Sequence, residues 1–303
     1  MQRLKKVAPA IPVALGEIHI KDHNEPARRL ALARHLTQPN HPLTSRVITN
    51  RVWQKHFGTG LVYTPSDFGS MGEQPSHPEL LDWLATEFIK QGWSFKKLHQ
   101  LIVNSRTYRQ ASQPQPAALR VDAESRLLWR FPPRRLEAEA VRDCILSVSG
   151  KLNLKMGGRG FDFFNQRGGL SDYHPKETFK EDGWRRMIYA HKIRMQAVDI
   201  FGAFDCPDAG QMKPRRTRSI TPVQSLSLLN SPFTNRQASF FAARVKNVAG
   251  NELRKQIDHA FMLVTSRTPT TDEQTALHSL AQQHGLQQVC RVLFNTSEFL
   301  YLR

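Results

Sequence analysis

The sequence predicts a mainly α-helical protein: a helical bundle of about nine helices with one long loop rich in glycine and aromatic residues, and a small β-ribbon. Three observations predict this fold class. Apolar residues recur every three or four positions along most of the 303 residues, as they do on one face of a helix. Glycines directly follow several of these stripes, as they do at helix C-termini. Alternation with period two is confined to residues 187–194.

The first half of the chain predicts three helices in succession. Residues 42–57 place their apolar side chains on one face, and Gly58 ends this helix because glycine readily adopts the left-handed cap conformation. The second helix begins near Pro78, since proline suits a first helical turn, and ends at Gly92. The third helix follows at residues 94–108.

The loop between the first two helices offers a candidate catalytic group. Asp67, Glu73 and His77 lie in this loop, and Arg51 and His56 lie on the helix before it. Carboxylate, imidazole and guanidinium groups serve acid–base and anion-stabilising chemistry. The alternative is structural: Asp67 caps a turn, while Glu73 and His77 bond nearby backbone N–H groups. Spacing alone does not decide between an active site and a well-bonded loop.

Charges of both signs alternate around the helix predicted at residues 136–150. They are Arg134, Arg135, Glu137, Glu139, Arg142 and Asp143. We interpret them as ion pairs within and between helices rather than as a catalytic centre, because spaced opposite charges on helices commonly form such pairs.

The composition changes between residues 151 and 183 to glycine, aspartate, phenylalanine and tyrosine. Turn-forming glycines and aromatics without a helical period predict a long exposed excursion rather than a core helix. Residues 187–194 follow as a short strand. Since one strand needs a partner, we expect it to pair with part of the preceding loop.

Two pairs of adjacent arginines predict an anion site. The predicted ligand-binding residues are Arg185, Arg186, Asp205, Asp208, Arg215, Arg216 and Thr217. Arginine offers a planar fork to sulfate, phosphate or carboxylate, and a helix predicted to begin near Thr221 adds free N–H groups. The alternative is that these arginines form structural salt bridges with the two aspartates of the site and with Glu181 and Asp182.

The remainder of the chain, from about residue 231, predicts a helical bundle. Thr270 or Thr271 before Asp272 and Glu273 forms an N-terminal capping pattern. The residues expected in the core of this bundle are Phe240, Phe241, Phe261, Leu263, Leu293, Phe294 and Phe299.

The sequence predicts no metal and no cofactor on this chain. Cys144, Cys206 and Cys290 lie far apart, and no haem-attachment, zinc or phosphate-loop motif is present. Cys206 is distinguished by the two carboxylates beside it in FDCPD, whereas the other two cysteines fit helical patterns. No apolar run is long enough to span a bilayer. Residues 1–16 imitate a signal peptide, but two prolines interrupt the apolar patch and no convincing cleavage site follows.

The formal net charge of +17 indicates electrostatic attraction to a negatively charged partner. The basic residues are dispersed through amphipathic helices, and no nucleic-acid-binding module is legible, which argues against a nucleic-acid binder. On charge alone, a sulfated or uronic polysaccharide is the better expectation.

The ordered motifs of the chain resemble those of the planctomycete-type domain of unknown function 1553 (DUF1553). They include NRVWQKHFGTGLV, PSDFGSMGEQPSHPELLDWLA, GWSFKKLHQLIVNSRTYRQAS, RRTRSITPVQSLSLLNSPF and CRVLFNTSEFLYL. The resemblance extends from about Pro26 to the C-terminus. It indicates the fold of the domain but not its reaction, because the function of the family is not established.

The resemblance implies a particular molecular context. Members of this family usually form the C-terminal part of secreted proteins that carry a c-type cytochrome domain upstream. It therefore implies a periplasmic or secreted protein, haem c only on an upstream domain or a partner, and an exported sulfatase-like protein as a second partner. Residues 1–25 would be the remnant of an upstream region or linker, and residues 26–303 the domain, as two helical lobes (26–150 and 184–303) joined by the loop 151–183.

Three hypotheses on function remain open. The first is an accessory or scaffold domain of a secreted, cytochrome-associated protein in redox or polysaccharide metabolism. The second is an enzyme, or a binding domain for an anionic glycan, that uses one of the two polar groups above. The third is a nucleic-acid binder attracted by the basic charge.

Overall fold

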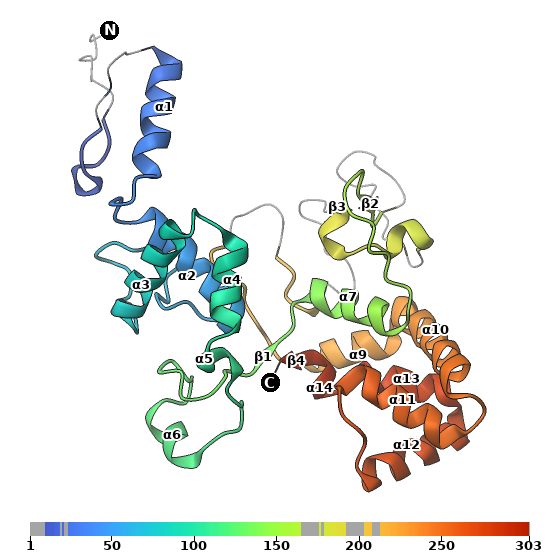
Figure 1. Ribbon diagram of the computed structural model, residues 1–303. Helices are drawn as coiled ribbons and strands as arrows, with labels where there is room; N and C mark the ends of the chain where they lie inside the picture. Colours follow the sequence, from blue (N-terminus) through green and yellow to red (C-terminus); the bar gives the residue numbers. More distant parts are fainter. Residues whose placement is uncertain are drawn as a thin grey trace. The chain divides into compact units, whose positions relative to one another are not determined.

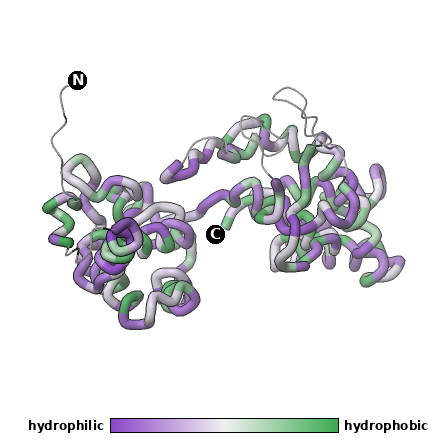
Figure 2. Tube along the Cα trace, turned by 90° about the horizontal axis from the view of Figure 1, so that it is seen from above, coloured by the Kyte–Doolittle hydropathy of each residue, from purple (hydrophilic) through white to green (hydrophobic). Residues whose placement is uncertain are grey.

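The computed structural model describes residues 10–18, 20, 24–164, 176, 179–191, 203–207 and 213–302 (Figure 1). The chain divides into two compact units, Met1–Pro132 and Pro133–Arg303. The predicted mainly helical fold is confirmed: the described residues form ten helices of seven or more residues, close to the nine expected. Hydrophilic and hydrophobic residues alternate along the helices of both units, as amphipathic elements require (Figure 2).

Helices and connecting loops make up the described residues of the first unit, with no strand among them. Its elements are η1 (Val13–Leu15), α1 (Glu25–Leu36), α2 (Thr44–Phe57), α3 (Pro78–Lys90), α4 (Phe95–Val103), α5 (Arg106–Arg109) and α6 (Pro116–Val121). Side-chain oxygens of Asn24, Ser94 and Ser105 accept N–H bonds at the starts of α1, α4 and α5. Gly58 ends α2 in the left-handed conformation, as predicted.

Asn50 fixes the loop after α2 to that helix. Its side chain is fully buried, donates to the carbonyl of Val62 at 3.0 Å and accepts from the N–H of Val62 at 2.9 Å. Gly60 allows this close approach, because a Cβ at that position would lie 2.6 Å from the Val62 carbonyl oxygen and 2.7 Å from the Asn50 side chain. The loop is thereby ordered over the core of Trp53, Phe57 and their neighbours.

The second unit is a helical bundle with two short strand pairs. Its elements are β1 (Arg134–Arg135), α7 (Ala138–Val148), β2 (Phe161–Asp162), η2 (Glu181–Trp184), η3 (Met187–Tyr189), β3 (Ala190–His191), α9 (Pro222–Asn230), α10 (Pro232–Ala249), α11 (Leu253–Thr265), α12 (Thr271–His284), α13 (Leu286–Leu293), α14 (Ser297–Leu300) and β4 (Tyr301–Leu302). The capping box predicted before α12 is present, formed by Thr270 and Glu273.

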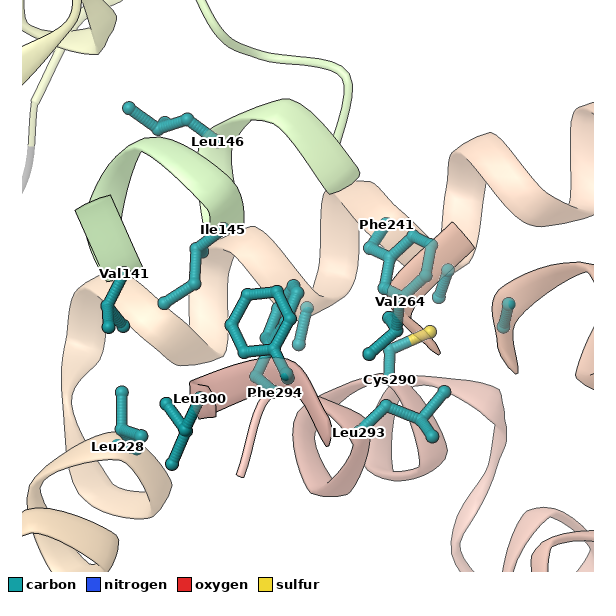
Figure 3. Close-up of a cluster of buried hydrophobic side chains, with 14 of the residues drawn as sticks. Val141, Ile145, Leu146, Leu228, Phe241, Val264, Cys290, Leu293, Phe294 and Leu300 are labelled. Carbon is teal, nitrogen blue, oxygen red and sulfur yellow. The ribbon is translucent and has the colours of Figure 1, made fainter. Parts of the chain in front are cut away.

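The core of the second unit lies between α7, α9, α10, α11 and α13 (Figure 3). The rings of Phe241 and Phe294 stack with centroids 5.6 Å apart, and Ile145 of α7 is buried in the same cluster. Of the seven core residues predicted for this bundle, five are buried, while Phe240 and Leu263 are partly buried against the core. Since α7 packs here, residues 138–148 belong to the second unit although they fall within the predicted first lobe.

The predicted strand is present but shorter than expected. β3 covers Ala190–His191, follows a 3-10 turn, and pairs in parallel with β2 of the preceding loop; positions 192–194 lie outside the described residues. A second pair, β1 with β4, is antiparallel and places Arg134 opposite Leu302. Two-residue strands are too short for their period to be visible in a sequence.

The prediction of an exposed excursion at 151–183 is wrong for the phenylalanines of this range, all of which the structure describes as buried. Phe161, Phe163 and Phe179 are buried, and they surround the guanidinium of Arg142 on α7 at 5.2–5.6 Å. Arg142 is 2% exposed and donates to the carbonyls of Gly183 and, at 3.0 Å, Arg185. These phenylalanines are core residues although their spacing has no helical period. They pack around the buried Arg142 guanidinium rather than along one face of a helix.

No helix among the described residues is both long and apolar enough to cross a bilayer.

Replacing Asn50 by alanine should destabilise the first unit by about 1–3 kcal/mol, because both backbone groups of Val62 lose their partner in a buried position. Denaturant unfolding followed by tryptophan fluorescence measures the change. The exposed Gln100→Ala serves as the control, and an equal loss in both variants would show that Asn50 does not fix the loop.

Candidate functional site

The densest polar group of the second unit joins four stretches of the chain. Arg135 comes from β1, Glu139 from the first turn of α7, Asp205 from the 203–207 segment, and Arg216 from the segment before α9. We call these four residues, with Ser219 and Gln224, the arginine–carboxylate network.

Arg135 and Gln224 are the buried members of the network. The guanidinium of Arg135 donates to Asp205 Oδ2 at 2.8 Å and also to the Ser219 carbonyl and to Gln224 Oε1. Asp205 in turn accepts from the N–H and hydroxyl of Ser219 at 2.7 and 2.8 Å. Burial alone would raise the pKa of Asp205, but these hydrogen bonds outweigh it and hold that pKa below its ordinary value. Asp205 is therefore an ionised structural acceptor.

Arg216 binds Glu139 with both arms of its fork. The two nitrogen–oxygen distances are 2.6 and 2.9 Å, and Glu137 lies 3.3 Å away. The hydrogen bonds that Arg216 donates to Glu139 raise the pKa of Arg216. The thiol of Cys206 lies 3.6 Å from the same carboxylate, within reach of a weak S–H donation. The Glu139 carboxylate thus accepts from the Arg216 guanidinium and lies within reach of the Cys206 thiol.

The other predicted ligand residues lie in different surroundings. Arg185 is buried, donates to the carbonyls of Lys155, Gly157 and Arg159, and stacks 3.8 Å from the ring centroid of Tyr189. These bonds, with a second to Lys155, occupy four of the five N–H groups that a guanidinium has.

Arg186 is exposed and lies 3.7 Å from Asp143 of α7. Arg215 and Thr217 are exposed as well, and Asp208 lies outside the described residues. Of the seven predicted residues, the arginine–carboxylate network therefore contains Asp205 and Arg216.

The network includes partners that the site prediction did not contain. Glu139 and Arg135 belong to the alternating charges interpreted above as ion pairs within and between helices. Glu139 instead pairs with Arg216, which lies in the non-helical segment before α9. The sequence did not indicate Ser219 and Gln224 as members of the network, because a hydroxyl or amide side chain near a helix start is common in any sequence.

In the first unit, the predicted residues on α2 bind separate partners. Arg51 is exposed and reaches Ser66 Oγ at 3.4 Å. His56 Nε2 lies 2.7 Å from His99 Nδ1, so that α2 and α4 are joined by an imidazole pair.

The predicted loop residues are also bonded locally. Asp67 accepts from the N–H of Gly69 at 2.9 Å, which confirms the expected turn cap. Glu73 lies 3.4 Å from Arg126, and His77 Nδ1 lies 2.9 Å from Ser76 Oγ, so both bond side chains rather than the expected backbone groups. Among the residues that the structure describes, no three His, Cys, Asp or Glu side chains are grouped as metal ligands.

A groove of about 780 Å³ runs along α3 and α4 of the first unit. Its walls carry Leu80, Trp83 and Leu101, and Trp83 is half exposed. The polar residues that line it are amides and hydroxyls with one cation, Lys97, and its lining contains no carboxylate or imidazole.

A family model described as a protein of unknown function (DUF1553, PSD1) matches residues 28–281. The chain belongs to the DUF1553 family. The expected resemblance is thereby confirmed, and the match includes α7 and the arginine–carboxylate network. No curated protein and no solved structure matches the chain.

Replacing Glu139 by glutamine should lower the stability of this DUF1553 chain by about 1–2 kcal/mol, since the partly buried Arg216 loses the carboxylate that binds both arms of its fork. The matched control is Glu252→Gln, whose carboxylate pairs with Lys255 on an exposed surface and should change stability by less than about 0.5 kcal/mol. Thermal and denaturant unfolding measure both variants. Equal effects would mean that the fork contributes no more than a surface ion pair.

Proposed function

We propose that this DUF1553 chain is an accessory or scaffold domain of a secreted, c-type cytochrome-associated protein that acts in redox or polysaccharide metabolism. The observation that carries the proposal is that the polar side chains suited to catalysis are bonded to one another or to backbone groups. Asp205 receives three hydrogen bonds, and Glu139 receives both arms of Arg216.

A catalytic acid or base needs an accessible position and a pKa adjusted to its task. The network offers carboxylates that are held by arginine, with the pKa of Asp205 lowered. The cysteine thiols of the core are equally unsuited to nucleophilic attack, because burial raises the pKa of Cys290 to about 12 and also raises that of Cys144. These features support a binding role over a catalytic one.

The groove along α3 and α4 supplies a surface for that role. A half-exposed indole on a concave apolar surface is a typical anchor in protein interfaces. Phe95, at the start of α4, adds a second large exposed ring. In this proposal, haem c resides on the partner domain, and the groove binds a polypeptide surface of that domain.

The proposal is tested by mixing the chain with a c-type cytochrome domain encoded with it and following haem absorbance in size-exclusion chromatography. We expect co-elution, weakened at least about tenfold in affinity by Trp83→Ala, since removing a buried anchor costs more than about 1.4 kcal/mol. The control is Val121→Ala, an exposed apolar residue on α6 outside the groove. Absence of binding, or turnover of a sulfate ester or glycoside that Glu139→Gln abolishes, would contradict the scaffold role.

An anionic glycan ligand is the second candidate, favoured by crowding of like charges before α9. Desolvation and the neighbouring arginines 135, 215 and 216 lower the pKa of Arg218, against the opposing effect of Glu137. A sulfate or uronate group near Arg215 and Arg218 would relieve this repulsion and benefit from the fork geometry.

This candidate predicts that Arg215→Lys and Arg218→Lys together weaken binding of a sulfated oligosaccharide at least about threefold, because lysine keeps the charge and loses the fork. Calorimetry at two salt concentrations measures the affinity, with Arg254→Lys on α11 as the control. Unchanged affinity removes the reason for placing a glycan there. Tighter binding of DNA than of the oligosaccharide, with a steep salt dependence, would favour the nucleic-acid hypothesis instead.

A further inference from the structure

His41 occupies the position of a helix cap at the start of α2. Its Nδ1 accepts from the backbone N–H of Leu43 at 3.3 Å and from that of Thr44 at 3.1 Å, and it lies 3.0 Å from Thr44 Oγ. Leu43, the residue at the N-cap, provides no side-chain cap of its own. An imidazole nitrogen that accepts two N–H bonds must be unprotonated, so the cap exists only while His41 is neutral.

His35 is the counterpart of His41 at the end of α1. The two rings meet edge to face with centroids 5.2 Å apart. Both side chains are more than nine-tenths buried, and His35 is the buried residue of α1. Within the described part of the chain, neither ring nitrogen of His35, nor Nε2 of His41, has a hydrogen-bond partner. The end of α1 and the segment before α2 therefore meet through two buried imidazoles, and a charge on a buried ring is unfavourable.

Charged groups of both signs lie on the elements next to the two rings. Arg46 on α2 donates to the Pro42 carbonyl at 2.9 Å and is paired with Asp82 of α3 at 2.6 Å, so its own counter-ion is already engaged. Arg34 precedes His35 in the last turn of α1. A carboxylate, Glu17, follows Gly16, and a Cβ at Gly16 would lie 3.7 Å from the His35 ring. The positive end of α2 also opposes a cation at His41.

We propose that His35 and His41 form an acid-sensitive latch, which holds α1 against the start of α2 near neutral pH and releases it as the pH falls below about 6.5. Burial, followed by the charge of His35, lowers the pKa of His41. A lowered pKa in the closed state means that the open state binds protons more tightly, so closure is fully favoured above the ordinary histidine value of about 6.5 and weakens below it.

The latch has a local readout in amide hydrogen exchange. The protection of the Leu43 and Thr44 amides, corrected for the intrinsic pH dependence of exchange, should fall at least about threefold between about pH 7.5 and pH 5 in the full chain, because protonation of His41 Nδ1 removes the acceptor of both N–H groups. In His41→Asn, whose amide oxygen caps without titrating, the change should be less than about twofold.

The control is His99→Asn, which removes the other imidazole pair of the first unit, that of His56 and His99. It should retain the wild-type pH response. The latch is excluded if His41→Asn responds as the wild type does, or if His99→Asn abolishes the response.

Two further measurements keep the test decisive. If His41→Asn fails to fold, the imidazole Cε1–H resonances of the wild type are titrated: a midpoint for His41 below that of His99 supports the latch, and an equal or higher midpoint overturns it. If added Zn²⁺ raises the protection in the wild type but not in His35→Asn, the pair is a metal site and the latch is rejected.

Discussion

The second unit depends on a charge that it buries completely. Arg142 would be costly to bury without compensation, since desolvation of an ion outweighs most single contacts. The compensation comes from two backbone carbonyls, from the faces of phenylalanine rings, and from Asp143 at 4.0 Å. Burial lowers the pKa of Arg142 to about 10, which still leaves it charged near neutrality. A stretch with few regular elements is thereby ordered against α7.

Other arginines also act on backbone carbonyls rather than on partners outside the protein. Arg244 donates to the carbonyls of Ser147 and Val148 at the end of α7, and Arg291 donates to that of Leu229 at the end of α9. The last carbonyls of a helix lack intrahelical partners and carry a partial negative charge, so a guanidinium there satisfies both needs. Part of the formal charge of +17 is explained by this internal use.

The sequence predicted best what depends on neighbours along the chain. Helix stripes, the stop at Gly58, the capping box of Thr270 and Glu273, and the turn at Asp67 all follow from local hydrogen bonding. The bond between Glu139 and Arg216 joins positions 77 residues apart, and its geometry arises only after α7 is packed. The buried histidines at 35 and 41 were equally invisible, because a histidine in a helical pattern has no distinctive spacing.

The pairing of β1 with β4 brings the first and last described residues of the second unit close together. Arg134 and Leu302 are opposite each other in an antiparallel pair, and the N–H of Leu136 donates to the carbonyl of Leu300 at 2.8 Å, so entry and exit lie side by side (Figure 1). A module whose two ends meet can be inserted into a loop of another protein, or circularly permuted, with little loss of loop-closure entropy. This topology makes the helical bundle transferable as a single piece.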